Sequence, residues 1–360
     1  MLYNIMNYMT AYTINKSNHR TCYNSIDAAK MIAALLVVAI HSQPFTGIAN
    51  TIIIDVLARI AVPFFFLTSS YFFFIKPISK QNPIEYVKRL SILYVFWFII
   101  ESPITILNTF IEPETSFLHN LGLFVRNIFL GSTFRGSWFL TASMECVPLI
   151  FLLSKHLKTR TILVISVTIY IIAVLLTYYY IFLPEPLKIF SDTYRTYIGS
   201  MQLSWVSAFA PCAVGKFLAE NSTKFEKWAS KRISAGIIIC GILSLAEVLT
   251  VKHLYNEKAF EHTNPDVYFM LLPLVVLIFI YTIKHEINLP LNYKKIRSIS
   301  TIYYFSHFIF VYIIVIINKH IIHVDPILKY FIVVICCLIL SEIILNLSNK
   351  KRFKWLKYGF

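Results

Sequence analysis

Two basic side chains, Lys30 and His41, lie in the first strongly apolar stretch of the chain. They are eleven residues apart, close to three full turns of an α-helix, so both project from nearly the same face about 16 Å apart along the axis. Histidine titrates near neutral pH, which suits it to accepting a proton during catalysis. The spacing therefore predicts a helix that carries a cation at one end and a candidate general base, His41, at the other.

Two further polar positions lie inside apolar stretches. Glu145 follows Trp138 by about two helical turns, which places a carboxylate within an apolar helix. His307 closes the segment STIYYFSH, residues 300–307, whose hydroxyls and imidazole crowd two turns of a helix. We predict that this segment borders the same cavity as His41, with Glu145 close enough to orient an imidazole or an acceptor hydroxyl. A purely structural role, in which these groups satisfy one another or line a water-filled vestibule, fits the sequence equally well.

The composition around these residues is that of a membrane protein. Of the 360 residues 57% are hydrophobic and 14% charged, and the mean hydropathy is +0.66, which excludes a soluble globule. Backbone polar groups cannot remain unsatisfied in hydrocarbon, so apolar stretches of about 17 to 25 residues are expected to be membrane-spanning helices. We predict an all-α polytopic membrane protein with about ten such helices. The predicted spans are 26–45, 51–75, 90–111, 138–154, 161–183, 201–219, 233–251, 267–284, 300–318 and 327–347.

The loops between these spans differ in charge. With Lys284 and Lys329, at the ends of their spans, counted with the adjoining loops, Lys and Arg number 22 on the side that includes both termini and 8 on the other side. The positive-inside rule then places both termini in the cytoplasm, which requires an even number of helices. Residues 1–25 lack the layout of a secretory signal and are predicted to be a cytoplasmic tail. Residues 26–347 are predicted to form the transmembrane domain, and residues 348–360 a basic cytoplasmic tail.

Charge and cysteine content exclude several classes of function. The 33 Lys and Arg against 18 Asp and Glu give a net charge of +15, which we attribute to cytoplasmic loops facing anionic lipid and not to nucleic-acid binding. The six cysteines form no C-x-x-C pair and mostly lie in apolar runs, so neither a disulfide framework nor a metal site is predicted. No Walker or G-x-G-x-x-G element is present to bind a nucleotide.

Charged pairs within the spans have a structural interpretation. A charge near the bilayer centre costs about 2.5 to 3.5 kcal/mol on insertion scales, so each one requires a partner or a function. Asp55 and Arg59 are four residues apart, the spacing of a self-neutralising pair on one helix face, and we leave them out of the catalytic set. Asp27 and Lys30 are three residues apart at the entry of the first span, where Lys30 can also extend to the headgroups.

At these residues the sequence resembles the acyltransferase-3 family of integral membrane proteins, over about residues 25–350. SIDAAKMIAALLVVAIHSQPF is similar to the opening motif of that family, an Arg, ten residues and a His, with Lys30 in place of the Arg. ARIAVPFFFLTSSYFFF resembles its second-span motif, with Ser70 in place of a Gly. SWFLTA and STIYYFSH are similar to its W-F-L-x-A and S-T-x-x-I-Y-x-x-H patterns. Of a usual pair of Arg, Arg89 is present and Tyr86 takes the other place, and RGS replaces Gly-His-Leu before the Trp.

The resemblance implies a multi-pass protein of the cell membrane, the bacterial cytoplasmic membrane, that transfers an acyl group to a hydroxyl. The implied donor is acetyl-CoA or another acyl-CoA, bound as a substrate, with no permanently bound cofactor. The implied acceptor is a cell-envelope glycan or a small hydroxylated molecule, and membrane lipid and a second copy of the chain are further candidate partners. The predicted site comprises catalytic residues His41, Glu145 and His307, donor-binding residues Lys30, Lys88 and Arg89, and substrate-binding residues Trp138, Ser300 and Tyr303.

Two alternatives to the enzyme are compatible with the sequence. The strings IAALLVVAIHSQPF and NPDVYFMLLPLVVLIFIY also resemble the membrane half of serine racemases from vancomycin-resistance systems, for which uptake of serine is implied. A transporter requires a substrate site near the midplane and alternating access, for which the sequence shows no inverted repeat. The other alternative is a non-catalytic partner in polysaccharide export, which the incomplete pair of Arg favours.

Overall fold

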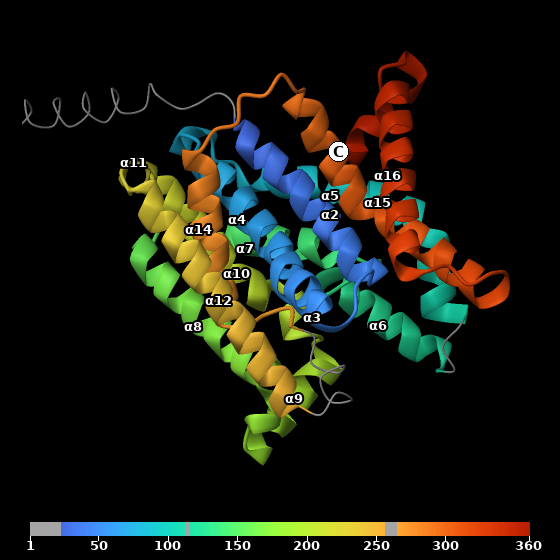
Figure 1. Ribbon diagram of the computed structural model, residues 1–360, viewed down its shortest axis with the longest axis horizontal. Helices are drawn as coiled ribbons and strands as arrows, with labels where there is room; N and C mark the ends of the chain where they lie inside the picture. Colours follow the sequence, from blue (N-terminus) through green and yellow to red (C-terminus); the bar gives the residue numbers. More distant parts are fainter. Residues whose placement is uncertain (1–22, 112–114, 256–264) are drawn as a thin grey trace, which may run out of the picture.

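The computed structural model describes residues 23–111, 115–255 and 265–360, and within these ranges the chain is helical and contains no strand (Figure 1). The predicted tail 1–25 and Cys22 therefore lie almost wholly outside the described residues. The main helices are α2 (Asn24–Ser42), α4 (Ala61–Phe74), α5 (Pro83–Ile106), α6 (Phe117–Leu130), α7 (Trp138–Leu153), α8 (Thr159–Thr177), α9 (Glu185–Tyr197), α10 (Trp205–Glu220), α12 (Ser230–Leu254), α14 (Leu271–Lys284), α15 (Tyr293–His320) and α16 (Pro326–Ser348).

Seven helical stretches are long and apolar enough to cross a bilayer, and they coincide with seven of the predicted spans. They are Asn24–Ser42, Gly47–Phe74, Ile78–Ile111, Thr159–Thr177, Ser230–Leu254, Tyr293–His320 and Pro326–Ser348. The other three predicted spans form the shorter helices α7, α10 and α14, of 16, 16 and 14 residues. The all-α polytopic architecture is thus confirmed. The count of ten and the cytoplasmic position of both termini stay predictions.

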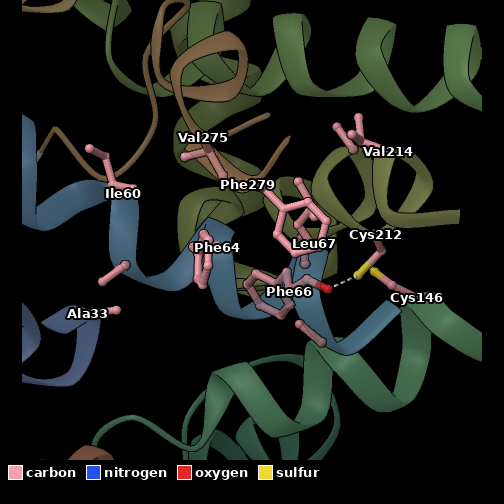
Figure 2. Packing of buried hydrophobic residues seen from close by; sticks show 14 of the residues in the cluster. Ala33, Ile60, Phe64, Phe66, Leu67, Cys146, Cys212, Val214, Val275 and Phe279 are labelled. Carbon is pink, nitrogen blue, oxygen red and sulfur yellow. Dashed lines mark hydrogen bonds between the residues drawn. The ribbon is translucent and has the colours of Figure 1, made fainter. Parts of the chain in front are cut away.

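Helix α10 forms the centre of the molecule and packs closely against α4. At Gly215 a Cβ would lie 2.6 Å from the carbonyl oxygen of Leu67, so only a glycine allows this approach. Across the same contact the Ser70 hydroxyl donates to the carbonyl of Cys212 at 2.6 Å. The Ser that stands in place of the Gly of the second-span motif therefore forms a hydrogen bond between α4 and α10. Figure 2 shows the α4 side chains, among them Phe66, interleaved with α7, α10 and α14. Small residues at helix contacts are typical of membrane bundles.

Helices α2, α15 and α16 form a second packed group. The start of α2 is fixed by Ser25, whose hydroxyl donates to the His285 carbonyl at 2.6 Å and accepts from the Ile287 amide at 2.7 Å. Figure 1 shows α2 and α15 side by side and running in the same direction, with α16 returning antiparallel to them. The group places one end of α2, with Lys30, on the side of α11 (Ser222–Glu226), and its other end, with His41, on the side of α3 (Gly47–Asn50) and α9.

The second predicted span is not a regular α-helix. It continues from α3 through a π-helix, η1 (Thr51–Leu57), and a 3-10 turn, η2 (Ala58–Ile60), before α4 begins. The predicted pairing of Asp55 with Arg59 is wrong. Asp55 instead accepts from Lys252 of α12 at 2.9 Å, and Arg59 pairs with Asp266. In a π-helix the hydrogen bonds run from i to i+5, so residues four apart no longer share one face as they do in an α-helix.

The predicted tail 348–360 contains an ordered 3-10 segment, η7 (Lys351–Gly359), that packs on the middle of α5. The indole of Trp97, fully buried, donates to the carbonyl of Gly359 at 3.0 Å, and a Cβ at Gly359 would collide with the ring of Phe96. Trp355 lies 5.9 Å from the same ring. Apolar side chains thus dock this segment on the bundle, while its Lys and Arg side chains stay exposed.

Candidate active site

The structure brings His41 and His307 together. His41 lies in the last turn of α2, His307 lies in the middle of α15, and the centroids of the two rings are 5.3 Å apart. The ring of Phe308 packs against both imidazoles, at 4.3 Å from His41 and 4.1 Å from His307. Residues more than 260 positions apart in sequence thus form one three-ring cluster at the end of α2 opposite Lys30.

The two imidazoles differ in environment. His307 is fully buried, and its Nδ1 lies 3.0 Å from the carbonyl oxygen of Tyr303. A carbonyl oxygen only accepts, so Nδ1 carries the proton and Nε2 of the neutral ring keeps a free lone pair. That Nε2 is buried and has no hydrogen-bond partner among the described residues. His41 is only partly buried, so a ligand can reach His41 before it reaches His307.

Gly136 fixes the position of Phe308 and so of the histidine pair. Its φ of +84° lies in the left-handed region that favours glycine, and a Cβ there would lie 3.1 Å from the Phe308 ring. The Tyr304 hydroxyl donates to the Gly136 carbonyl at 3.3 Å. The segment RGS, which departs from the resembling motif, thus provides a backbone surface for the three-ring cluster.

A cavity opens between α2, α4, α7, α8 and α10, and neither His41 nor His307 lines it. It encloses about 430 Å³ of space, part of it open to the surroundings. Trp138, predicted to contact substrate, lines it, as does Ile40, the neighbour of His41. The ion pair of Arg59 and Asp266 forms its polar wall. The cavity therefore combines apolar and aromatic surface with one fixed pair of charges, as small-molecule sites commonly do.

Three other predicted site residues lie apart from this cluster. Glu145 is partly buried on α7, forms no hydrogen bond or ion pair within the described ranges, and acts electrostatically on Tyr194 and not on either histidine. The Ser300 hydroxyl donates to the Arg297 carbonyl at 2.8 Å, within its own helix. The Tyr303 hydroxyl donates to the Val334 carbonyl of α16 at 2.8 Å, whereas its backbone carbonyl holds His307.

Of the predicted donor-binding residues, Lys30 lies toward the opposite end of α2, and Lys88 and Arg89 lie on α5. Lys30 lies 5.9 Å over the ring of Phe72 and is within electrostatic range of Arg89 and Arg297. Lys88 and Arg89 are both exposed on α5. This end of the bundle therefore concentrates positive charge from three helices, α2, α5 and α15.

Arg297 belongs to this cationic end and was missed by the sequence analysis. Its guanidinium donates two hydrogen bonds to the carboxylate of Asp27, at 2.8 and 2.7 Å, so Asp27 pairs across to α15 instead of along its own helix with Lys30. The only sequence signal is the position of Arg297 about one helical turn before the 300–307 segment. Because Arg297 lies between two predicted spans, the sequence analysis assigned it to a loop. A further position missed as a site residue is Glu101 of α5, which is buried, has an oxygen without a hydrogen-bond partner, and lies within electrostatic range of Arg135.

Tyr86 shows what replaces the second basic residue of the resembling motif. It is buried in α5, and its hydroxyl lies 2.8 Å from the hydroxyl of Ser69 in α4. A charged side chain at this position would require a partner that the surrounding aromatic rings, such as Phe73 at 5.3 Å, do not provide. The substitution therefore exchanges a cation for a hydrogen bond between helices.

Comparison with known proteins gives both a family and two relatives. Residues 23–345 match the family described as an acyltransferase domain. Two curated proteins of Enterococcus faecalis, each named amino-acid racemase, are similar: one is 25% identical over 354 residues, covering 94% of this chain and 48% of the relative. The other is 27% identical over 267 residues, covering 71% of this chain and 35% of the relative. The chain thus spans less than half the length of these relatives. No solved structure matches.

Proposed function

Because the chain belongs to the membrane-embedded acyltransferase-3 family, we propose that it transfers an acetyl group from acetyl-CoA to a hydroxyl of a cell-envelope glycan or a related acceptor. The observation that carries the proposal is the position of two packed imidazoles at one end of α2 and of a cationic cluster at the other. The acyltransferase family gives the class of reaction; the donor, the acceptor and the residue roles are our proposal.

In the proposed reaction His41 is the general base. The acceptor hydroxyl gives its proton to the imidazole while its oxygen attacks the carbonyl carbon of the thioester. The tetrahedral intermediate then collapses, the carbon–sulfur bond breaks, and His41 returns the proton to the departing sulfur of CoA. The partial exposure of His41 supports this role, because a base must contact the hydroxyl that it deprotonates.

His307 is proposed to position His41 and to share its proton. Its ring is held by the Tyr303 carbonyl and carries an acceptor lone pair on Nε2, next to the His41 ring. A buried acceptor without a partner carries a free-energy penalty that a proton from a neighbouring imidazole relieves. Glu145, which makes no contact with either ring, is proposed to act on the acceptor and not on the histidines.

The donor is proposed to bind at the opposite end of α2, on the cytoplasmic side. Acetyl-CoA carries several phosphates, and the exposed cations Lys88, Arg89 and Arg297, together with the partly buried Lys30, offer complementary charge. Lys30 presents a compact ammonium where the family usually has the bidentate fork of Arg, so it contacts a phosphate as a point charge.

Replacement of Lys30 tests the donor site. Lys30→Ala is expected to raise the dissociation constant for acetyl-CoA about tenfold, the effect of losing one charge-assisted hydrogen bond, whereas Lys30→Arg should bind as well as the natural protein or better. Calorimetric titration of the purified protein with acetyl-CoA measures both. Lys319→Ala, an exposed cation at the other end of the bundle, is the matched control. Equal affinity in Lys30→Ala and Lys319→Ala would contradict the assignment.

The same titration separates the enzyme from a transporter. The relatives are named for action on amino acids, and a carrier of serine would bind free serine without any acyl donor. We expect heat on adding acetyl-CoA and none on adding serine alone. Serine binding together with no donor heat would overturn the proposed function.

A further inference from the structure

Positive charge surrounds the proposed catalytic base. Three cations, Arg59, Arg135 and Lys329, each act electrostatically on His41, and they come from η2, from the loop before α7 and from the first turn of α16. The second imidazole, His307, lies on the remaining side. No function assigned above uses Arg135 or Lys329.

Helix packing independently places Lys329 level with His41. Ala34 and Val38 of α2 share one buried cluster with Val333 and Cys337 of α16. The two helices run in opposite directions, so the step from Val38 forward to His41 corresponds to the step from Val333 back to Lys329 (Figure 1). Lys329 is partly buried and forms no ion pair within the described residues.

Backbone packing likewise places Arg135 at the histidine pair. It directly precedes Gly136, whose backbone contacts the Phe308 ring that packs on both imidazoles. The Arg135 side chain is exposed and forms no ion pair in the described part of the chain.

Carboxylates offset only part of this charge. Asp266 is committed to Arg59. Glu101 lies within electrostatic range of Arg135 but is buried and forms no ion pair with it. Two cations near His41 therefore remain without an ion-pair partner among the described residues, Arg135 being exposed and Lys329 half-buried. Such a pair of cations attracts and orients an anion.

We propose that the acceptor is an anionic molecule, whose carboxylate or phosphate is bound by Arg135 and Lys329 while its hydroxyl contacts His41. This proposal rests on the proposed function and adds the chemical class of the acceptor. Arg135 supplies a planar fork suited to two oxygens of a carboxylate or phosphate, and Lys329 a point charge. Binding of the acid group fixes the acceptor at two points, which orients the hydroxyl toward the base.

The experiment compares three acceptors that share the hydroxyls at C2, C3 and C4 and differ in the group at C6. Methyl glucoside, methyl glucuronide and methyl glucoside 6-phosphate share ring hydroxyls, and the last two add a carboxylate or a phosphate. Binding of each is measured by calorimetry, and transfer from radiolabelled acetyl-CoA by product counting, in nanodiscs of phosphatidylcholine, which supply no anionic lipid. We expect one or both acids to bind about tenfold more tightly than the neutral glucoside, with a preference that declines as salt is raised. Whichever acid binds more tightly shows whether the site recognises a carboxylate or a phosphate.

Variants test whether Arg135 and Lys329 cause the preference for acid over neutral glucosides. Arg135→Gln and Lys329→Gln should each bring the ratio of acid to neutral affinity toward one, whereas Lys319→Gln, an exposed cation at the same end, should keep the ratio of the natural protein. Equal affinity for acid and neutral glucosides, or no binding of either acid, would overturn the proposal. Because affinity is measured without donor, an acid preference without any acetyl transfer would refute the proposed function and leave this site standing.

Discussion

Replacement of His41 by Ala is expected to lower the rate of acyl transfer by about 10²- to 10⁴-fold, the contribution typical of one well-placed general base. In the proposed reaction the ring accepts the proton of the acceptor hydroxyl, and no other described side chain at this end combines partial exposure with contact to the His307 ring. His41 forms no hydrogen bond with the described residues, so its loss should leave the fold intact. The measurement is transfer of label from acetyl-CoA by purified protein, with thermal stability followed in parallel.

His320→Ala is the matched control for this variant, because His320 is exposed at the end of α15 and distant from the cluster in sequence and structure. It should keep full activity. His307→Ala is a less direct test, since that ring is fully buried and its removal leaves a cavity that lowers stability. Full transfer by a folded His41→Ala protein would show that the base lies elsewhere.

Replacement of Gly215 by Ala should be the most destabilising single-methyl change that the structure allows us to identify. The added Cβ would lie 2.6 Å from the Leu67 carbonyl oxygen and 3.0 Å from the Tyr71 amide, both backbone atoms of α4 that cannot rotate away. The helices must separate, which also lengthens the hydrogen bond from Ser70 to the Cys212 carbonyl. Overpacking of this kind costs about 1–3 kcal/mol, sometimes more. A lowered thermal midpoint in detergent or nanodiscs measures the effect.

Gly241→Ala isolates the contact from the general effect of adding a methyl group to a helical glycine. Gly241 also lies inside a helix, α12, but nothing is within 4 Å of the position its Cβ would take. Because Ala favours the helix over Gly, this variant should be neutral or slightly stabilising. If both variants melt alike, the close approach of α10 to α4 does not limit stability.

The parts of the fold that follow from local periodicity and hydropathy could be predicted from the sequence. Seven predicted spans coincide with helices long enough to cross a bilayer, because burial of backbone polar groups in lipid dictates length directly. The spacing of Lys30 and His41 could also be converted into positions along α2, because the rise per residue of an α-helix is fixed. The structure also places His41 beside His307 of the 300–307 segment, but it does not place Glu145 beside these rings, as had been expected.

Partners supplied by distant segments could not be predicted in the same way. Asp27 binds Arg297 and Asp55 binds Lys252, although each had a nearer candidate on its own helix. The choice depends on helix packing and, for Asp55, on a π-helix that no propensity marks. Charge in the 348–360 segment suggested a basic cytoplasmic tail, whereas Leu356 is buried and the Gly359 carbonyl accepts a hydrogen bond from Trp97 of α5. A single sequence does not reveal the surface against which such a segment packs.

Helix α2 contacts α15 near both of its own ends, through Asp27 with Arg297 near one and through His41 with His307 and Phe308, in the middle of α15, at the other. Contacts near both ends of α2 couple the two helices, so a ligand that displaced α2 at one end would also displace α15. For the proposed donor and acceptor, thermodynamic linkage makes such an effect reciprocal: the factor by which bound donor changes acceptor affinity equals the factor by which bound acceptor changes donor affinity. The coupling free energy between the two binding steps therefore depends on both ends of α2 together.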